Sequence, residues 1–246
     1  MNLTIVNTGS KGNAYILKSD TGQVLLIEVG VKFGKIKEAL NFDLNCVAGC
    51  IVTHEHADHS KGMREALVFG VDVYASKGTI EAMKLKHHRL KQMEAKIMYE
   101  IGEYKVIPFN TIHDSAEPFG FLINHPECGN TMFITDSAYV PYKFPDLNNI
   151  IIEANYSLKK IQEKLYANAM MEFLHNRIVK SHMSIETCIE VLTANDLSQV
   201  CNIVLIHLSD SNSDAKAFYN IANDITGKKI HIAEKGLSIP FNVTPF

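Results

Sequence analysis

The chain has 246 residues, of which 46% are hydrophobic, and its 24 basic and 27 acidic side chains give a formal net charge of -3. This apolar content can bury a sizeable core, and the charge excludes a protein that binds nucleic acid through its whole surface. No stretch approaches the roughly 18 apolar residues of a membrane span, and the first residues lack the basic and apolar regions of a secretory signal. We therefore expect one domain over residues 1–246, in the cytoplasm and not in a membrane.

Hydrophobic runs and turn residues predict an irregular alternation of strands and helices. In the first half, strands are expected at 3–6, 14–18, 24–28, 50–53, 71–75, 97–99, 104–109, 119–124 and 131–135, with helices at 35–40, 59–69 and 79–86. In the second half, strands are expected at 149–153, 202–207 and 229–232, with helices at 158–175, 184–194 and 214–225. Strand-rich halves with helices at intervals are typical of an α/β (α+β) fold, here a four-layer αβ/βα sandwich.

The segment HEHADH at residues 54–59 directly follows a short apolar run that reads as a buried strand. Neutral imidazole and carboxylate groups are ligands that hold zinc-like ions at about 2.0–2.2 Å. His54 and His56 stand two apart on an extended segment and project to the same side, whereas Asp58 and His59 lie where the chain turns toward a helix. Packing gives no reason to desolvate so many polar groups together. The segment therefore predicts a metal site, and one loop can serve two adjacent ions.

This segment resembles the HxHxDH signature of the metallo-β-lactamase fold, in which further ligands come from strand ends. His113, Asp136 and His207 each follow or end a predicted strand, where side chains can converge on one edge of a sheet. The resemblance implies that one ion is held by His54, His56 and His113, that a second is held by Asp58, His59 and His207, and that Asp136 bridges both. These nitrogen and oxygen ligands suit zinc, with manganese as the alternative.

One position departs from the family pattern. The strand expected at 24–28 ends in Glu28, where the family usually has aspartate. A group at that place typically orients the metal loop without touching an ion. The extra methylene of Glu28 leaves the expected ligand set unchanged but alters the hydrogen bonds expected around it.

Two residues of the carboxy-terminal third favour phosphodiester chemistry. Glu153 ends the apolar run at 149–153, and His182 lies in the segment SHMS at 181–184. With TGSKGN at residues 8–13, they resemble the tRNase Z branch of the superfamily, and within it small bacterial single-domain 5′ to 3′ DNA exonucleases. Ser181 and Ser184 are also good helix N-caps, which explains the serines but not Glu153 and His182.

The resemblance to tRNase Z implies a division of labour among these residues. Two ions would polarise the phosphodiester and activate water, with Asp58 as a ligand of the second ion. Glu153 would keep His182 protonated, and His182 would donate a proton to the leaving alkoxide. We therefore expect Asp58, Glu153 and His182 to be the catalytic residues.

Features outside the motifs bear on the substrate. The basic stretch at 84–96 either lies along a phosphate backbone or is an ordinary solvated helix end, and the sequence does not separate the two. The loop at 9–13 either presents backbone amides and Lys11 to a phosphate or is a simple hairpin connection. No inserted clamping domain and no long arm for gripping tRNA is evident, so DNA or a simpler phosphodiester is favoured over tRNA.

Three functions follow from these observations. The preferred hypothesis is a metal-dependent 5′ to 3′ DNA exonuclease. The alternative is a small-molecule phosphodiesterase of the cyclic nucleotide type, or more distantly a lactonase or thioesterase, although these last two would not need the pair Glu153 and His182. A third hypothesis is a non-catalytic metal-binding interaction protein, against which the complete ligand set argues.

The cysteines point to a reducing compartment. Cys46, Cys50, Cys128, Cys188 and Cys201 are odd in number, widely spread and mostly within apolar patterns. They indicate buried thiols rather than a disulfide framework. No partner pair at zinc-finger spacing accompanies Cys46 and Cys50, so the sequence does not favour a structural zinc site there.

Overall fold

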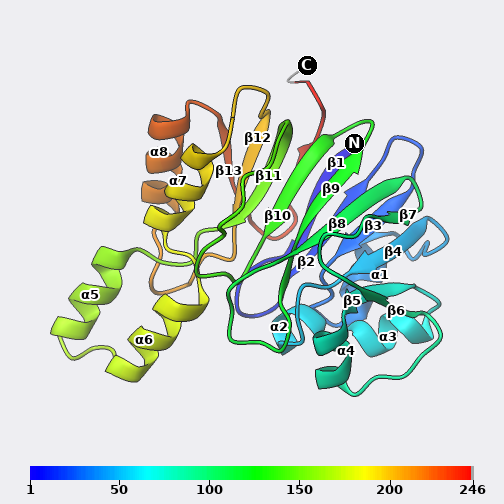
Figure 1. Cartoon of the computed structure of the whole chain (residues 1–246), viewed down its shortest axis with the longest axis horizontal. Coiled ribbons are helices and arrows are strands. Elements are labelled where there is room, and N and C mark those ends of the chain that lie inside the picture. Colours follow the sequence, from blue (N-terminus) through cyan, green and yellow to red (C-terminus); the bar gives the residue numbers. More distant parts are fainter. Residues whose placement is uncertain (245–246) are drawn as a thin grey trace.

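Two seven-stranded sheets form the centre of the computed structural model, which describes residues 1–244 (Figure 1). In spatial order the first sheet contains β14 (Ser238–Pro240), β1 (Asn2–Asn7), β2 (Ala14–Lys18), β3 (Val24–Ile27), β4 (Val47–Ile51), β5 (Val73–Ser76) and β6 (Leu90–Met93). The second contains β13 (Lys229–Ile232), β12 (Asn202–Ile206), β11 (Leu147–Glu153), β10 (Gly129–Ile134), β9 (Phe119–His125), β8 (Tyr104–Asn110) and β7 (Tyr99–Ile101).

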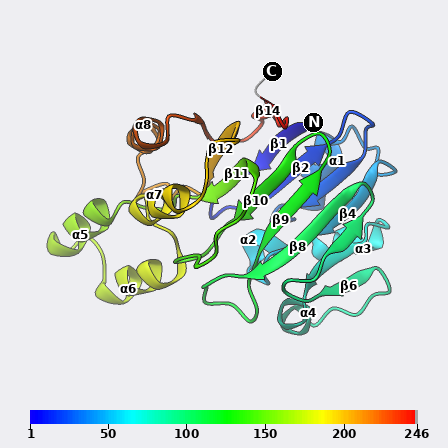
Figure 2. The ribbon, with the colours of Figure 1, turned by 45° about the horizontal axis from the view of Figure 1, so that its top comes forward.

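Eight helices accompany the described strands. α1 (Phe33–Ala39), α2 (Ala57–Ser60), α3 (Met63–Val68) and α4 (Lys77–Met83) follow strands of the first sheet. α5 (Leu158–Tyr166), α6 (Glu172–Ser181), α7 (Ile185–Ala194) and α8 (Ala215–Thr226) belong to the carboxy-terminal part. α5 and α6 project from one end of the molecule in both views (Figures 1 and 2). Among residues 1–244, no helix is both long and apolar enough to cross a membrane.

Three hydrophobic clusters separate four layers. Between the sheets lie large buried side chains such as Tyr15 and Phe119. Phe33 of α1 packs in a second cluster on the outer face of the first sheet. Phe218 of α8 belongs to a third cluster on the outer face of the second sheet. Apolar faces of sheets and helices leave water together in this arrangement, and the predicted four-layer αβ/βα sandwich is confirmed.

Parallel pairing places the predicted site residues at one level. β3, β4, β5 and β6 run parallel in one sheet, as do β10, β11, β12 and β13 in the other. Their register sets Ile134 beside Ile152 and Glu153 beside Ile206. The residues that follow β10 and β12 therefore leave the second sheet at the same edge as Glu153.

Two predicted helices are each broken in two. The helix expected at 158–175 is α5 and α6, because Asn168 adopts a left-handed backbone (φ 53°) between them and so cannot continue a right-handed helix. The helix expected at 59–69 is α2 and α3, because the Gly62 amide between them donates to the Val29 carbonyl (2.8 Å) instead of continuing the turn. Both breaks depend on the tertiary structure, so the helix propensity of the local sequence does not reveal them.

Two strands were not predicted, and two were displaced, one of them β4, which lies two to three residues before the strand expected at 50–53. β14 pairs with β1, and β6 pairs with β5 inside the basic stretch at 84–96, so most of this stretch is not the end of a helix. The strand expected at 97–99 lies instead at β7, two residues later. Short edge strands depend on a neighbouring strand more than on their own pattern. The five cysteines are free thiols, and Cys50, Cys128 and Cys188 are buried.

Candidate metal centre

The predicted ligands converge from the edges of both sheets. The loop after β4 brings His54 and His56, and α2 brings Asp58 and His59. The second sheet contributes the others, namely His113 after β8, Asp136 after β10 and His207 after β12. Both His54 and His59 are buried, with exposed fractions of 1% and 0%. The structure therefore brings together every ligand that the sequence predicted.

Three of the strand ends turn in an uncommon way. Glu28, Asp136 and His207 have positive φ angles of 66°, 45° and 55°. Such left-handed values cost about 1–3 kcal/mol for residues other than glycine and persist where the surroundings hold them. The sharp turn comes directly after β3 and β12, and two residues after β10. At each of these three turns, a polar side chain is placed in the cluster or, for Glu28, directly behind it.

The first group of candidate ligands consists of His54, His56, His113 and Asp136, whose ligand atoms lie within 4.8 Å of one another. Asp136 Oδ2 lies 3.7 Å from His54 Nε2 and 3.5 Å from His113 Nε2. His56 Nδ1 lies 3.0 Å from His113 Nε2. Two ring nitrogens at this distance share either one proton or one cation.

The second group consists of Asp58, His59, Asp136 and His207, again within 4.8 Å of one another. His59 Nε2 lies 3.3 Å from Asp136 Oδ2 and 3.5 Å from Asp58 Oδ2. His207 Nε2 lies 3.6 Å from Asp58 Oδ2. Asp136 belongs to both groups, which is the division that the family resemblance implies, while the assignment of each ligand to an ion stays a prediction.

The chemistry of the cluster fits divalent cations. His54 Nε2 and His207 Nε2 are buried without a hydrogen-bond partner, which is rare for polar atoms inside a protein. Burial lowers the pKa of His207, but the carboxylates of Asp136, Asp58 and Glu153 outweigh it and raise that pKa to about 10. Carboxylates this close together repel one another unless positive charge lies between them. Cations bound between the two groups would supply it and would give the unpartnered nitrogens a ligand role.

Surrounding groups orient the imidazoles. His113 Nδ1 donates to the Ser181 carbonyl at 2.7 Å, and His54 Nδ1 lies 2.9 Å from Thr53 Oγ1. Each contact occupies one ring nitrogen and leaves Nε2 for the cluster. Such outer contacts fix the tautomer and the direction of a ligand.

Glu28 lies behind the metal loop. It is fully buried, its Oε1 accepts from the Thr53 amide at 3.2 Å, and the same oxygen lies 3.5 Å from His59 Nδ1. Burial raises the pKa of Glu28, and the nearby His59 opposes the rise. The carboxylate thus contacts the backbone that leads into the loop and one ring within it, which agrees with an orienting role.

Glu28→Ala is expected to weaken metal affinity by about 10- to 100-fold, because Thr53 and His59 lose the carboxylate that holds them. Glu28→Asp should keep most of the affinity, since aspartate tolerates the left-handed backbone better than glutamate. Competition with a chelator measures both. An alanine variant with parental affinity would show that Glu28 does not orient the loop.

Glu153 and His182 form a pair beside the second group. Glu153 Oε1 lies 2.8 Å from His182 Nδ1 and 3.0 Å from His207 Nδ1. Its Oε2 accepts from the amides of Ser137 (3.0 Å) and Met183 (3.1 Å). Glu153 is fully buried, and this set of donors holds its orientation.

His182 is both restrained and accessible. Its side chain is 21% exposed and lines the cavity over the cluster. Burial lowers its pKa, but Glu153 outweighs that effect, so the pKa of His182 is raised. Since Glu153 contacts Nδ1, the other ring nitrogen is left for the cavity. Asp136, Glu153, His182 and His207 also form a third group within 4.8 Å, so a ligand role for His182 has to be separated from an acid role by experiment.

A cavity of about 310 Å³ opens over the cluster. α6 forms one wall with Leu174, Arg177 and Ile178, and Ser10 and Ser209 line it as well. Sequence reasoning missed Arg177, because a single arginine within a helical pattern carries no local signal.

Two amides were also missed as parts of the site. Asn13 Nδ2 lies 3.1 Å from His59 Nε2, and Asn155 Nδ2 donates to the His207 carbonyl at 2.9 Å. Both stand in segments that were singled out for other residues. The closeness of Asn13 and Asn155 to these motifs in the sequence was the signal that could have identified them as site residues.

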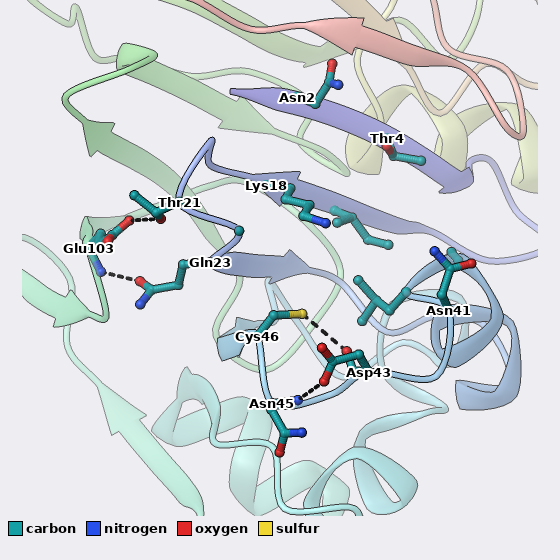
Figure 3. A pocket seen from close by; sticks show the side chains of 14 residues that line it. Asn2, Thr4, Lys18, Thr21, Gln23, Asn41, Asp43, Asn45, Cys46 and Glu103 are labelled. Atoms are coloured by element: carbon teal, nitrogen blue, oxygen red, sulfur yellow. Dashed lines mark hydrogen bonds between the residues drawn. The ribbon is translucent and has the colours of Figure 1, made fainter.

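A hollow of about 720 Å³ lies elsewhere, beside β1, β2 and the loops around residues 20–23 and 41–46 (Figure 3). Some of its side chains bond to one another or to neighbouring backbone: Thr21 Oγ1 donates to Glu103 at 2.9 Å, and Cys46 Sγ donates to the Asp43 carbonyl at 3.2 Å. It shares no lining residue with the metal cluster. Size alone therefore does not make it the reaction site.

The fold and the ligand cluster together define a metal-dependent hydrolase. A family model described as the beta-lactamase superfamily domain matches residues 36–208, and the chain belongs to this family. It is 26% identical over 252 residues to the exodeoxyribonuclease YycJ of Bacillus anthracis, covering 95% of this chain and 92% of YycJ.

Solved structures share the fold. The metallo-beta-lactamase fold protein YhfI of Bacillus subtilis has a TM-score of 0.75 at 15% identity, covering 97% of this chain and 98% of YhfI. The short form of human tRNase Z has a TM-score of 0.63 at 14% identity, covering 98% and 99%. The predicted metallo-β-lactamase resemblance is confirmed. This fold implies divalent metal binding, and the histidine and aspartate cluster lies where the sequence predicted it.

Proposed function

We propose that the chain hydrolyses phosphodiester bonds and acts on DNA as a 5′ to 3′ exonuclease. The observation that carries the proposal is the pair Glu153 and His182, 2.8 Å apart, beside the candidate ligands and facing the cavity. The similarity to YycJ, a protein named as an exodeoxyribonuclease, supports DNA as the substrate.

Glu153 and His182 would supply the proton that the leaving group of a phosphodiester needs. Two divalent ions, for which zinc is the proposed identity and manganese the alternative, would be held by the two ligand groups and would supply Lewis acidity toward water and the phosphoryl group. The departing sugar oxygen leaves poorly unless it is protonated. His182 would donate that proton from the cavity side, and the buried Glu153 would keep the ring charged and oriented.

Arg177 would contact a substrate phosphate. It lines the cavity, and its Nε donates to Asp114 Oδ2 at 3.0 Å on the exposed side. A guanidinium presents several donors, so one ion pair leaves others for a phosphate. Asp114 would then hold Arg177 at the cavity wall.

Arg177→Ala is expected to lower kcat/KM on DNA by about 10- to 100-fold, since hydrogen bonds to charged groups contribute about 1.5–3 kcal/mol. Arg64→Ala is the matched control, because Arg64 is an exposed arginine of α3 that does not line the cavity, so this variant should keep kcat/KM close to the parental value. Steady-state kinetics of both variants measure the difference. Equal losses would indicate a general effect of lost positive charge and not a phosphate contact at the cavity.

A panel of substrates tests the proposed function. The purified protein, loaded with zinc or manganese, is offered single- and double-stranded DNA labelled at the 5′ or the 3′ end, with either a phosphate or a hydroxyl at the 5′ terminus. Release of mononucleotides from the 5′ end is the expected result. A cyclic nucleotide and a lactone serve as competing substrates. Hydrolysis of either one without cleavage of DNA would overturn the proposal.

A further inference from the structure

Four lysines gather in a hollow of about 390 Å³ near the metal loop. The lysine hollow is lined by Lys11, Lys32, Lys35 and Lys61, with Val31 as the other lining residue. The lysines come from three separate segments: the loop between β1 and β2, the start of α1, and the residue directly after α2. All four are exposed.

Little negative charge compensates this cluster. Lys11 pairs with Asp210 at 2.8 Å, and both side chains are largely exposed, so water and salt screen the pair. Within residues 1–244, no carboxylate lies within ion-pair distance of Lys32, Lys35 or Lys61. The Lys61 ammonium donates to the Lys11 carbonyl at 3.1 Å, which brings two of the segments together. A local excess of positive charge thus stands on a chain whose net charge is -3.

Backbone contacts tie the lysine hollow to the metal loop. The Asn13 amide donates to the Asp58 carbonyl at 2.7 Å, and the Gly30 amide donates to the Asn13 carbonyl at 2.8 Å. A Cβ atom at Gly30 would come within 1.6 Å of the Asp58 carbonyl oxygen, so only glycine allows this approach. The three segments therefore form one rigid unit, with the lysines on its outer side.

The two hollows also adjoin along the chain. Ser10 lines the cavity over the metal cluster, and the next residue, Lys11, lines the lysine hollow. The basic stretch at 84–96, an alternative phosphate-binding candidate in the sequence, contributes no residue to either hollow. Of the two basic features, the lysine hollow is thus the one placed beside the reaction site.

We propose that the lysine hollow binds backbone phosphates of a nucleic acid strand whose end lies in the metal cavity. This inference rests on the proposed nuclease function and adds a subsite for phosphates away from the bond that is cut. Lysine ammonium groups bind phosphates as point charges and release condensed counterions, without reading the bases. A small phosphodiester would occupy the metal cavity alone and would not reach the lysines.

A triple variant, Lys32→Ala with Lys35→Ala and Lys61→Ala, tests the subsite. The probe is a single-stranded DNA oligonucleotide with phosphorothioate linkages, which resists cleavage, and its binding to the metal-loaded protein is followed by fluorescence anisotropy. Loss of three phosphate contacts should flatten the slope of log K against log salt by about 2 and weaken binding by about 10²-fold near 0.1 M salt. Hydrolysis of bis(p-nitrophenyl) phosphate should stay at the parental rate.

The matched control is a triple variant in which three other exposed lysines are replaced by alanine, namely Lys105 of β8, Lys216 of α8 and Lys229 of β13. It changes the net charge by the same amount and should keep the parental affinity and salt slope. If both triple variants bind the oligonucleotide equally weakly, the loss of affinity comes from the change in net charge, and the proposed subsite is wrong. Thermal unfolding and metal content of both variants verify that the fold is kept.

The outcomes separate the two proposals. If the parent cleaves DNA and the triple variant binds the oligonucleotide as the parent does, the subsite is wrong and the nuclease proposal stands. If the parent binds the oligonucleotide through these lysines but cleaves no DNA, the subsite stands and the nuclease proposal is wrong. If the parent does not bind the oligonucleotide at all, both fail.

Discussion

His182→Ala is expected to lower the rate of DNA cleavage by about 10²-fold or more, while lowering the hydrolysis of bis(p-nitrophenyl) phosphate much less. The sugar alkoxide needs a proton as it leaves, whereas nitrophenolate is stable without one. His182 contacts Glu153 through Nδ1 and lines the cavity, so its loss removes the proposed proton donor. Metal content, measured by elemental analysis, should equal that of the parent.

His175→Ala is the matched control for this prediction. His175 lies within α6, whose last residue directly precedes His182, but it contacts Asn176 and does not line the cavity. It should be neutral on both substrates. If His182 is instead a metal ligand, as the third group of candidate ligands allows, His182→Ala should lose metal and slow both substrates together. Equal losses on the two esters would therefore refute the acid role.

Asp58→Ala is expected to lose one of about two ions and nearly all activity. Asp58 Oδ2 lies 3.5 Å from His59 Nε2 and 3.6 Å from His207 Nε2, so its removal deprives the second group of a carboxylate. Only one carboxylate, Asp136, would then remain in that group. Elemental analysis of the purified variant measures the loss. Parental metal content in Asp58→Ala would overturn the assignment of this residue as a ligand.

Glu55→Gln controls for damage to the loop. Glu55 lies within the same HEHADH segment, but its Oε1 accepts from the Ala116 amide at 2.8 Å, and it belongs to none of the three groups. Its replacement should leave the metal content and the activity close to the parental values. The two variants together distinguish a lost ligand from a disturbed loop.

The arrangement separates three tasks among different parts of the chain. The two groups of candidate ligands come from α2 and from loops of both sheets. The proposed acid follows α6, and the proposed phosphate subsite lies on segments that connect elements of the first sheet. Ser181 joins two of these parts, because its carbonyl accepts from His113 while the next residue is His182. A shift of α6 would therefore disturb a candidate ligand and the proposed acid together.

The sequence by itself determined the candidate ligand types, their order along the chain and the fold class. The HEHADH segment, the strand-end positions of His113, Asp136 and His207, and the alternation of strands and helices are local patterns. Hydrophobic periodicity and polar groups after buried strands are visible in a single chain because they depend on neighbouring residues. The single domain over residues 1–246 stays a prediction.

Tertiary structure alone decided which residues meet. The left-handed backbone of Glu28, Asp136 and His207 is held by the surrounding structure, because this conformation is uncommon for any residue other than glycine and least favoured here by glutamate. The breaks at Gly62 and Asn168, the place of Arg177 at the cavity and the gathering of four lysines from three segments likewise depend on contacts between distant parts of the chain. Such contacts act through space, and a local sequence pattern does not record them.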